Sequence, residues 1–339
     1  MVLGKNMSKQ KKILPSEKKH TRLVLKKSKT DPKYGQKPED RSVEHLLKSS
    51  MIIIDKPNGP TSHQVDSWIK QIFKDKKIGH HGTLDPNATG VLPVGIGDAV
   101  KSLYALLPAG KEYVGIMKLH KDIDEEKIRK TCENFIGKIS QMPPVRSAVK
   151  RRRRSREIYY LDIIDIDDRD VLFRVGCESG TYVRTLVVDI GRKLRCGAHL
   201  SDLRRTRVGN LNEKDSVFLQ DVKDAFVFYK EDNDEKYLKN ILQPVEKLIM
   251  HLPKIIILDS AVDSICHGAN LAIPGIAEID TDIKKDTICA VMTLKDEGVA
   301  IAKSLMSTEE IVQKKTGFCT DTQRVMMKKD RYPSVWKKS

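Results

Sequence analysis

Apolar residues in the first part of the chain follow patterns that predict a strand and then a helix. A continuous apolar run over residues 51–54 ends in the charged turn Asp55-Lys56-Pro57, which is typical of a buried strand that carries Lys56 at its end. Four apolar residues then recur at helical spacing: Trp68, Ile69, Ile72 and Phe73. They predict an amphipathic helix over about residues 64–74, with Trp68 in the protein core.

Strands and helices continue to alternate further along the chain. Apolar and polar residues alternate near residues 113–119 and 158–176, as expected of a sheet with one exposed face. Helical spacing returns after Arg184 in four apolar residues: Leu186, Val187, Ile190 and Leu194. They predict a helix that starts near Val183. The mixed order of elements predicts an α+β fold.

The last third of the chain predicts a second, smaller domain. Residues 237–250 are expected to form a helix interrupted by Pro244, and a domain boundary is predicted at Leu252-Pro253. Three short β-type runs follow, separated by turns, over residues 255–258, 290–294 and 299–302. Such runs are consistent with a small β-barrel. At about 150 residues per domain, the length of 339 residues agrees with domains at 50–252 and 253–339.

Positive charge is concentrated near the N-terminus. Residues 1–50 hold 14 Lys or Arg and 5 Asp or Glu, hence a net charge of +9. Residues 1–49 are therefore predicted to form a basic extension that is disordered alone and becomes ordered on RNA or on the second domain. A solvated tail is the alternative.

The whole chain has a formal net charge of +16, which predicts a polyanionic partner. Lys and Arg side chains that neutralise phosphates release counterions and gain affinity, so nucleic acid is the first expectation. A membrane is disfavoured because no apolar run approaches the roughly 20 residues of a spanning helix, and no signal peptide is recognisable. The sequence therefore predicts a soluble, intracellular protein.

The cysteines and short motifs argue against metal and redox chemistry. Six cysteines are scattered without any Cys-x-x-Cys pair and are predicted to be buried thiols: Cys132, Cys177, Cys196, Cys266, Cys289 and Cys319. The chain also lacks P-loop, dinucleotide-binding and zinc signatures. No cofactor and no metal are therefore expected.

A block of basic residues is a candidate RNA contact. Six of the seven residues at 150–156 are basic: Lys150, Arg151, Arg152, Arg153, Arg154 and Arg156. Guanidinium groups bind phosphate with two parallel hydrogen bonds and stack on exposed bases, which suits a folded RNA. A nuclear-localisation signal is the alternative. The position of the block between predicted strands favours the RNA contact.

Candidate chemistry lies in the loop at residues 79–90, which reads Gly-His-His-Gly-Thr-Leu-Asp-Pro-Asn-Ala-Thr-Gly. Its glycines allow close approach of the backbone to a ligand, and it carries one acidic side chain, Asp85. Taken alone, such a loop is more often an ordinary turn with an Asx cap. Arg184 lies at a predicted helix N-terminus, where the helix dipole favours anions, so a carboxylate or phosphate partner is expected.

The loop resembles the active-site motif of the TruB and dyskerin family of RNA pseudouridine synthases. Further matches follow in the family's order: residues 55–62 (Asp-Lys-Pro-Asn-Gly-Pro-Thr-Ser), 111–113 (Lys-Glu-Tyr), 179–186 (Ser-Gly-Thr-Tyr-Val-Arg-Thr-Leu) and 198–206 (Ala-His-Leu-Ser-Asp-Leu-Arg-Arg-Thr). The resemblance covers nearly everything after residue 49. Residues 143–152 and the C-terminal region are similar to archaeal dyskerin homologues, the catalytic subunits of H/ACA guide RNA particles.

The resemblance implies a fold and an active site. The fold is a pseudouridine-synthase domain with a mixed, mainly antiparallel sheet, followed by a small PUA β-barrel. Asp85 assists cleavage of the glycosidic bond, by covalent attack or by proton abstraction from the sugar, and the sequence leaves both routes open. Arg184 pairs with Asp85, and Tyr113 packs on the extruded uracil.

Other site residues are implied in the same way. Tyr182 and Leu203 line the pocket, His80 helps the rearranged RNA to fit, and Lys56 is structural or faces a phosphate. His81 departs from the family, which usually carries a small residue there, and its side chain is expected to point outward. In the PUA domain, the motif that begins with His267, Gly268 and Ala269 is expected to hold the terminal trinucleotide of the guide RNA.

The implied partners are an H/ACA guide RNA, a substrate ribosomal or transfer RNA, and the small proteins of the particle. A stand-alone transfer-RNA pseudouridine synthase and a non-catalytic RNA-binding scaffold are the alternatives. The chain ends without the long Lys-rich tail of eukaryotic dyskerins. An archaeal source and a cytoplasmic location are therefore expected, or a nucleolar location if the source is eukaryotic.

Overall fold

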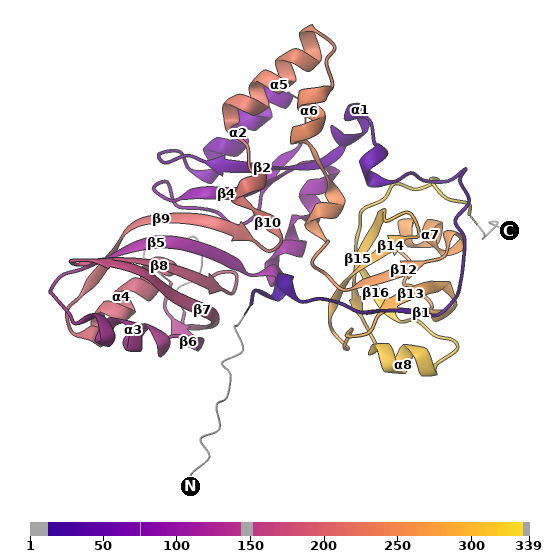
Figure 1. The fold of residues 1–339 in the computed structure, drawn as a ribbon. Helices are drawn as coiled ribbons and strands as arrows, with labels where there is room; N and C mark the ends of the chain where they lie inside the picture. Colours follow the sequence, from indigo (N-terminus) through magenta and orange to yellow (C-terminus); the bar gives the residue numbers. More distant parts are fainter. Residues whose placement is uncertain (1–12, 75, 144–151, 335–339) are drawn as a thin grey trace.

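The computed structural model describes residues 13–74, 76–143 and 152–334. Two sheets organise this part of the chain: a ten-stranded sheet, and a six-stranded sheet built mainly from the C-terminal region. Figure 1 shows them side by side, with the indigo N-terminal segment running past both. The two-part α+β architecture agrees with the prediction.

The larger sheet is mixed and mainly antiparallel, as expected. Its path of neighbouring strands is β11 (Gln243–Pro244), β2 (Ser49–Lys56), β4 (Thr89–Gly97), β9 (Ala198–Val208), β5 (Lys111–Leu119), β8 (Asp170–Cys177), β7 (Arg154–Asp167) and β6 (Gly137–Gln141). Two short strands lie off this path, β3 (Ile78–His80) beside β4 and β10 (Leu211–Asn212) beside β9. Within the part of the chain that is described, β4 and β9 form the parallel pair of this sheet.

Helices cover the larger sheet in two groups, because each has one apolar face to bury. One group is α3 (Glu125–Glu133) and α4 (Val183–Leu194), whose apolar residues share a core with β5, β7 and β8. The other is α2 (Ser62–Phe73), α5 (Leu219–Glu231) and α6 (Lys236–Ile241), packed with β2 and β4. The remaining α-helices of the described residues are α1 (Val43–Leu46), α7 (Asp259–Cys266) and α8 (Thr308–Gln313), and a long 3-10 helix, Asp98–Ala109, follows β4.

The predicted helix near residues 64–74 is α2, but the prediction for Trp68 was wrong. A capping box between Thr61 and Gln64 starts the helix, and its buried stripe is centred on Ile69. Trp68 is 42% exposed. One residue corresponds to about 100° around a helix, so Trp68 lies beside the buried stripe and not within it.

The helix expected over residues 237–250 is broken more completely than predicted. After α6 ends at Ile241, Gln243–Pro244 forms the edge strand β11 against β2. A short 3-10 helix, Val245–Leu248, follows. Because proline lacks an N–H group, it is tolerated on a sheet edge and not inside a helix.

The smaller sheet takes one strand from the N-terminal extension. Its order is β1 (Arg22–Val24), β13 (Ile276–Asp280), β12 (Lys254–Ile257), β14 (Ile288–Thr293), β15 (Gly298–Ser304) and β16 (Thr320–Val325). Arg22 on β1 donates to Asp280 at 3.0 Å, and Thr30 donates to Asp259 at 3.0 Å. The extension is therefore folded from residue 13 onward, and its β1 and Thr30 lie on the second domain, one of the two predicted sites. Its two ends lie on the first domain instead, where Glu17 pairs with Arg207 and the apolar residues of α1 pack with β2 and β4.

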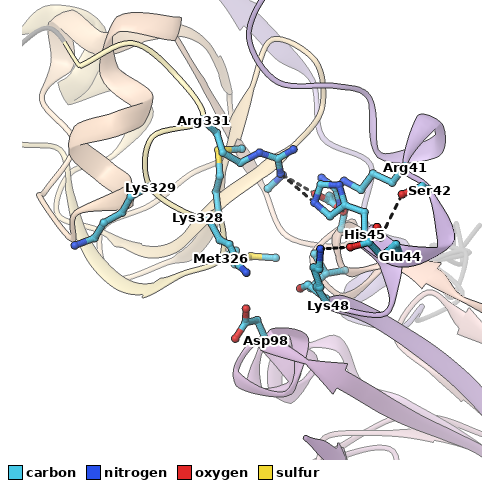
Figure 2. Close-up of a pocket in the computed structure, with 15 residues that line it drawn as sticks. Arg41, Ser42, Glu44, His45, Lys48, Asp98, Met326, Lys328, Lys329 and Arg331 are labelled. Atoms are coloured by element: carbon cyan, nitrogen blue, oxygen red, sulfur yellow. Dashed lines mark hydrogen bonds and ion pairs between the residues drawn. The ribbon is translucent and has the colours of Figure 1, made fainter. Parts of the chain in front are cut away.

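A buried ion pair joins the extension to both sheets. The Arg41 guanidinium donates to both carboxylate oxygens of Glu246, at 2.7 and 2.8 Å, and both side chains are buried. Glu246 also accepts the backbone N–H of Gly298 at the start of β15. Beside the Arg41–Glu246 ion pair lies a cavity of about 440 Å³, where Arg331 donates to His45 at 3.3 Å (Figure 2).

All six cysteines are buried free thiols, as predicted. Among the described residues, no helix has both the length and the apolar character needed to cross a lipid bilayer.

Candidate active site

Asp85 lies on the loop between β3 and β4, and this loop is held on both sides of it. The Ser62 hydroxyl at the start of α2 accepts from the Leu84 N–H at 2.9 Å and donates to the Leu84 carbonyl at 3.2 Å. On the other side, the Gly59 N–H donates to the Pro86 carbonyl at 3.0 Å. The Asp85 side chain itself is 59% exposed, so a fixed loop presents an accessible carboxylate.

Arg184 lies directly against Asp85. Its Nη2 donates to Asp85 Oδ2 at 2.5 Å, which confirms the expected pairing. Leu84 and Val183, the residues before each partner, belong to the same apolar cluster as Tyr113. Packing of this cluster therefore brings together two charged side chains that are 99 positions apart in the sequence.

Lys56 is structural, one of its two predicted roles. It is fully buried at the end of β2, and its ammonium donates to the carbonyls of Pro57, Pro60 and Pro86 at 2.7, 2.8 and 3.0 Å. Burial lowers its pKa, and the nearby positive charge of Arg205 lowers it further. Lys56 thus ties the β2–α2 turn to the loop that carries Asp85.

Two more buried cations lie beneath the loop. Arg205 donates to the carbonyls of Val91 at 2.7 Å and Gly82 at 2.6 Å. Burial and the charge of Arg205 lower the pKa of Lys111 to about 7. Gly82 has φ +69°, and a side chain there would come within 2.6 Å of Lys111 Nζ. The floor of the loop is therefore tightly packed and carries the positive charge of Arg205.

The Tyr113 side chain is nearly fully buried. It is 8% exposed within the core beside Arg205, and burial raises the pKa of its hydroxyl. Leu203 packs against the same cluster. Tyr182 precedes α4 and is held by Gln141, which accepts from its N–H at 3.0 Å. The structure therefore gathers these three predicted residues around Asp85 and Arg184, and their roles stay predictions.

His80 makes contacts on the α2 side of the loop. Its Nδ1 lies 2.7 Å from Asp66 Oδ2, and its Nε2 lies 3.1 Å from Thr83 Oγ1. Its ring packs edge-on against His63, with ring centroids 5.0 Å apart. Asp66 and Thr83 therefore orient the imidazole that was predicted to help the RNA to fit.

The expectation that His81 points outward was wrong. Residues next to each other along an extended segment face opposite sides, so His81 points away from His80 and into the cationic floor. Its exposure is only 9%, and its Nε2 has no hydrogen-bond partner among the described residues. Burial, then the charges of Lys111 and Arg205, lower the pKa of His81 to about 3.

His81→Ser is expected to make the protein less sensitive to acid. An unfolded histidine titrates near pH 6.5, so between pH 6.5 and about 3 the unfolded chain binds more protons than the folded chain. Stability therefore falls as pH is lowered through this range, by up to about 1.4 kcal/mol per pH unit from this one group. Urea unfolding at pH 7, 5.5 and 4.5 should show a shallower decline in the variant. The exposed His199→Ser is the control, and equal slopes in His81→Ser and the parent chain would contradict the assignment.

The predicted RNA contacts lie in two separate places. Lys150 and Arg151 fall outside the described residues, whereas Arg152 is exposed and Arg154 and Arg156 are half-buried on or beside β7. Next to this block, a cavity of about 920 Å³ is lined by four basic residues among others: Arg153, Arg184, Arg192 and Lys193. The block thus continues to the Asp85 partner Arg184.

The predicted PUA motif lies far from Asp85. Figure 1 shows α7, which ends just before His267, and α4 at opposite ends of the molecule. The Ala269 carbonyl accepts from Thr322 on β16 at 2.7 Å, and Gly268 has open space where a side chain would start. The motif therefore forms an accessible corner of the second domain.

Comparison with known families accounts for this arrangement. Residues 70–183 match the TruB family pseudouridylate synthase N-terminal domain, and residues 184–250 match the tRNA pseudouridylate synthase B C-terminal domain. The chain belongs to the TruB family. It is a pseudouridine synthase. A PUA domain matches residues 253–326, and a DKCLD domain matches residues 12–66.

Archaeal relatives match along nearly the whole chain. A probable tRNA pseudouridine synthase B of Pyrococcus abyssi is 50% identical over 96% of this chain and 98% of its own length. One of Methanopyrus kandleri is 49% identical over 95% of this chain and 96% of its own length. A solved Cbf5-Nop10-Gar1 complex contains a chain with a TM-score of 0.92 and 48% identity, covering 96% of this chain and 99% of that one. An H/ACA ribonucleoprotein bound to substrate RNA matches with a TM-score of 0.90 and 46% identity, over 96% and 100%.

Sequence reasoning missed Arg205, Lys111 and Asp66. Arg205 and Lys111 stand inside the quoted motifs, but lysine and arginine are usually exposed, and nothing in the sequence shows that these two are buried. Asp66 lies on a helix among other polar residues and carries no motif. The sequence offered one clue to Arg205 and Lys111, because each lies two positions from a predicted site residue, Leu203 and Tyr113 respectively.

Proposed function

We propose that this chain is the catalytic subunit of an H/ACA guide RNA particle and isomerises uridine to pseudouridine in ribosomal or transfer RNA. The observation that carries the proposal is the ion pair of Asp85 and Arg184, exposed on a fixed loop over buried cations. The DKCLD and PUA matches on either side, and the likeness to chains solved in H/ACA complexes, support the guide-directed form.

The chemistry requires one carboxylate and no cofactor. The glycosidic bond between C1′ and N1 breaks, the uracil turns, C5 bonds to C1′, and the C5 proton is lost while N1 gains one. Asp85 acts on the sugar, either by attack at C1′ or as the base that removes a proton. Arg184 orients the carboxylate in both routes.

The target nucleotide leaves its stack to reach Asp85. Tyr113 then packs on the extruded uracil, Tyr182 and Leu203 line the pocket, and His80 helps the rearranged RNA to fit. Unstacking the nucleotide costs a few kcal/mol. Phosphate contacts with the basic residues that line the cavity beside Arg184 help to offset this cost.

Guide RNA is assigned to the second domain. The corner formed by His267, Gly268 and Ala269 would hold its terminal trinucleotide, so the guide would span the distance to the Asp85 loop. The partner proteins would be of the kinds named in the similar complexes, Nop10 and Gar1. The proposed location is the cytoplasm, and the archaeal relatives support the archaeal source on which this proposal rests.

A stand-alone transfer-RNA synthase is the second candidate, and the names of the archaeal relatives favour it. The deciding experiment measures pseudouridine in labelled target RNA, with and without a matching guide and the partner proteins. Turnover that needs guide and partners supports the proposal. Equal turnover on free transfer RNA would replace it with the stand-alone enzyme.

Neutralising Arg151, Arg152 and Arg154 together is expected to weaken RNA binding and flatten its salt dependence. Each lost phosphate contact removes counterion release, so the slope of log K against log salt should fall by roughly two to three. Filter binding from low to moderate salt measures this slope. The control neutralises Lys284 and Lys285 on the second domain. If the slope of log K against log salt is unchanged in the triple variant, the basic block does not contact RNA phosphates.

A further inference from the structure

Three side chains with metal-binding atoms meet beside the Asp85 loop. His63 and Asp66 are three positions apart on α2 and therefore share one face, and His80 ends β3 opposite them. One ligand atom from each lies within 4.8 Å of the other two. The proposed reaction uses His80, which Asp66 orients, but gives His63 no part.

The Asp66 carboxylate is only half satisfied. Its Oδ2 faces His80 Nδ1 at 2.7 Å, whereas its Oδ1 is buried and has no hydrogen-bond partner among the residues that the structure describes. A buried carboxylate oxygen without a partner raises the free energy of the folded state. A cation held by both carboxylate oxygens, or by one with the other turned toward a ligand water, would remove this cost.

The His80 ring is held at both of its nitrogens. Its Nδ1 lies 2.7 Å from Asp66 Oδ2, where an N–H donates to the carboxylate, and its Nε2 lies 3.1 Å from Thr83 Oγ1. A zinc ion between Nδ1 and Asp66 would replace the Nδ1 proton, and Nε2 would then donate to Thr83. Metal-binding histidines commonly use their second nitrogen in this way, which fixes the tautomer and the ring orientation. His63 is exposed, and one of its ring nitrogens already lies within 4.8 Å of the ligand atoms of Asp66 and His80.

We propose that His63, Asp66 and His80 bind a zinc ion. Two imidazoles and one carboxylate suit zinc, whereas magnesium and calcium prefer oxygen ligands. Tetrahedral bonds of about 2.0–2.1 Å place ligand atoms roughly 3.3 Å apart. Asp66 and His80 then separate by about 0.6 Å and His63 swings inward, with water as the fourth ligand.

Zinc at this site would act on the loop. His80 and Thr83 lead directly to Asp85, and a bound ion would tie this segment to α2 and occupy the imidazole. Zinc is therefore expected to inhibit isomerisation. This inhibition rests on the proposed function, whereas zinc binding does not.

The binding test titrates zinc chloride into the metal-free full chain by isothermal titration calorimetry, with cobalt absorption as a probe of coordination. The parent chain should bind one equivalent, and His63→Ala and Asp66→Asn should each lower the affinity at least about tenfold. The control is the double variant His120→Ala/His199→Ala, which removes a second histidine pair, 2.9 Å apart on β9 and after β5, and should bind as the parent does. No stoichiometric binding by the parent, or equal binding by His63→Ala and Asp66→Asn, would refute the site.

The activity test compares turnover with added zinc and after chelation. The parent should lose turnover with zinc and recover it with a chelator, while His63→Ala should stay insensitive. If zinc binds to the parent chain but leaves turnover unchanged, the proposed inhibition through the Asp85 loop is wrong. A parent without turnover under any condition would count against the proposed function and leave the binding result standing.

Discussion

Asp85→Asn is expected to lower turnover by at least about 10⁴-fold while RNA affinity and Tm stay close to those of the parent chain. The amide keeps nearly the shape of the carboxylate and still accepts from Arg184, but it is neutral and acts neither as nucleophile nor as base. The side chain is largely exposed, so little packing depends on it. Pseudouridine formation in single-turnover assays, together with RNA binding and thermal melts, measures all three quantities.

Asp162→Asn is the matched control. Its carboxylate is also exposed and accepts from an arginine, Arg174, at 2.7 Å on the neighbouring strand. This variant should keep parent turnover. Turnover by Asp85→Asn within tenfold of the parent would remove Asp85 from the chemistry, and a parallel loss of RNA binding would reassign it to binding.

Glu246→Ala is expected to destabilise the protein by about 3–5 kcal/mol, because it leaves the Arg41 guanidinium buried without its carboxylate. The Gly298 N–H loses its acceptor at the same time. Glu297 lies 3.9 Å from Arg41, but its other oxygen already accepts from Tyr332. For a chain of 339 residues, thermal melts should show a Tm lower by roughly 4–7 °C.

Adding Arg41→Met to Glu246→Ala should restore much of this stability, since no unpaired charge is then buried. The control is Glu125→Ala, which removes an exposed partner of Arg129 and should change stability by about 0.5 kcal/mol or less. If Glu246→Ala lowers the free energy of unfolding by less than about 1 kcal/mol, the Arg41–Glu246 ion pair does not hold the two sheets together.

Features that depend on neighbours in the sequence were predictable. The strand that ends at Lys56 and the helix from Val183 follow from local apolar spacing and match β2 and α4. The pairing of Asp85 with Arg184 was reached through the family resemblance and through the charge expected at a helix N-terminus. Secondary structure and motifs are local properties, so one sequence is enough to find them.

Features that depend on which side of an element is covered were not predictable. Trp68 has the spacing of a core residue but lines a cavity between α2 and α5 that is open to solvent, so 42% of it stays exposed. His81 was expected outside and lies inside, next to two buried cations. Apolar periodicity says which residues share a face, not which neighbouring element closes over it.

The sequence by itself determined the family, the α+β class, the candidate loop that carries Asp85 and the positive charge that points to RNA. Only the tertiary structure decided that Lys56, Lys111 and Arg205 lie buried beneath that loop, and that His63, Asp66 and His80 converge beside it. These groups come from separate strands and a helix, and their distances are set by sheet pairing and core packing. Burial and convergence of charged side chains are properties of the folded chain, and no local pattern encodes them.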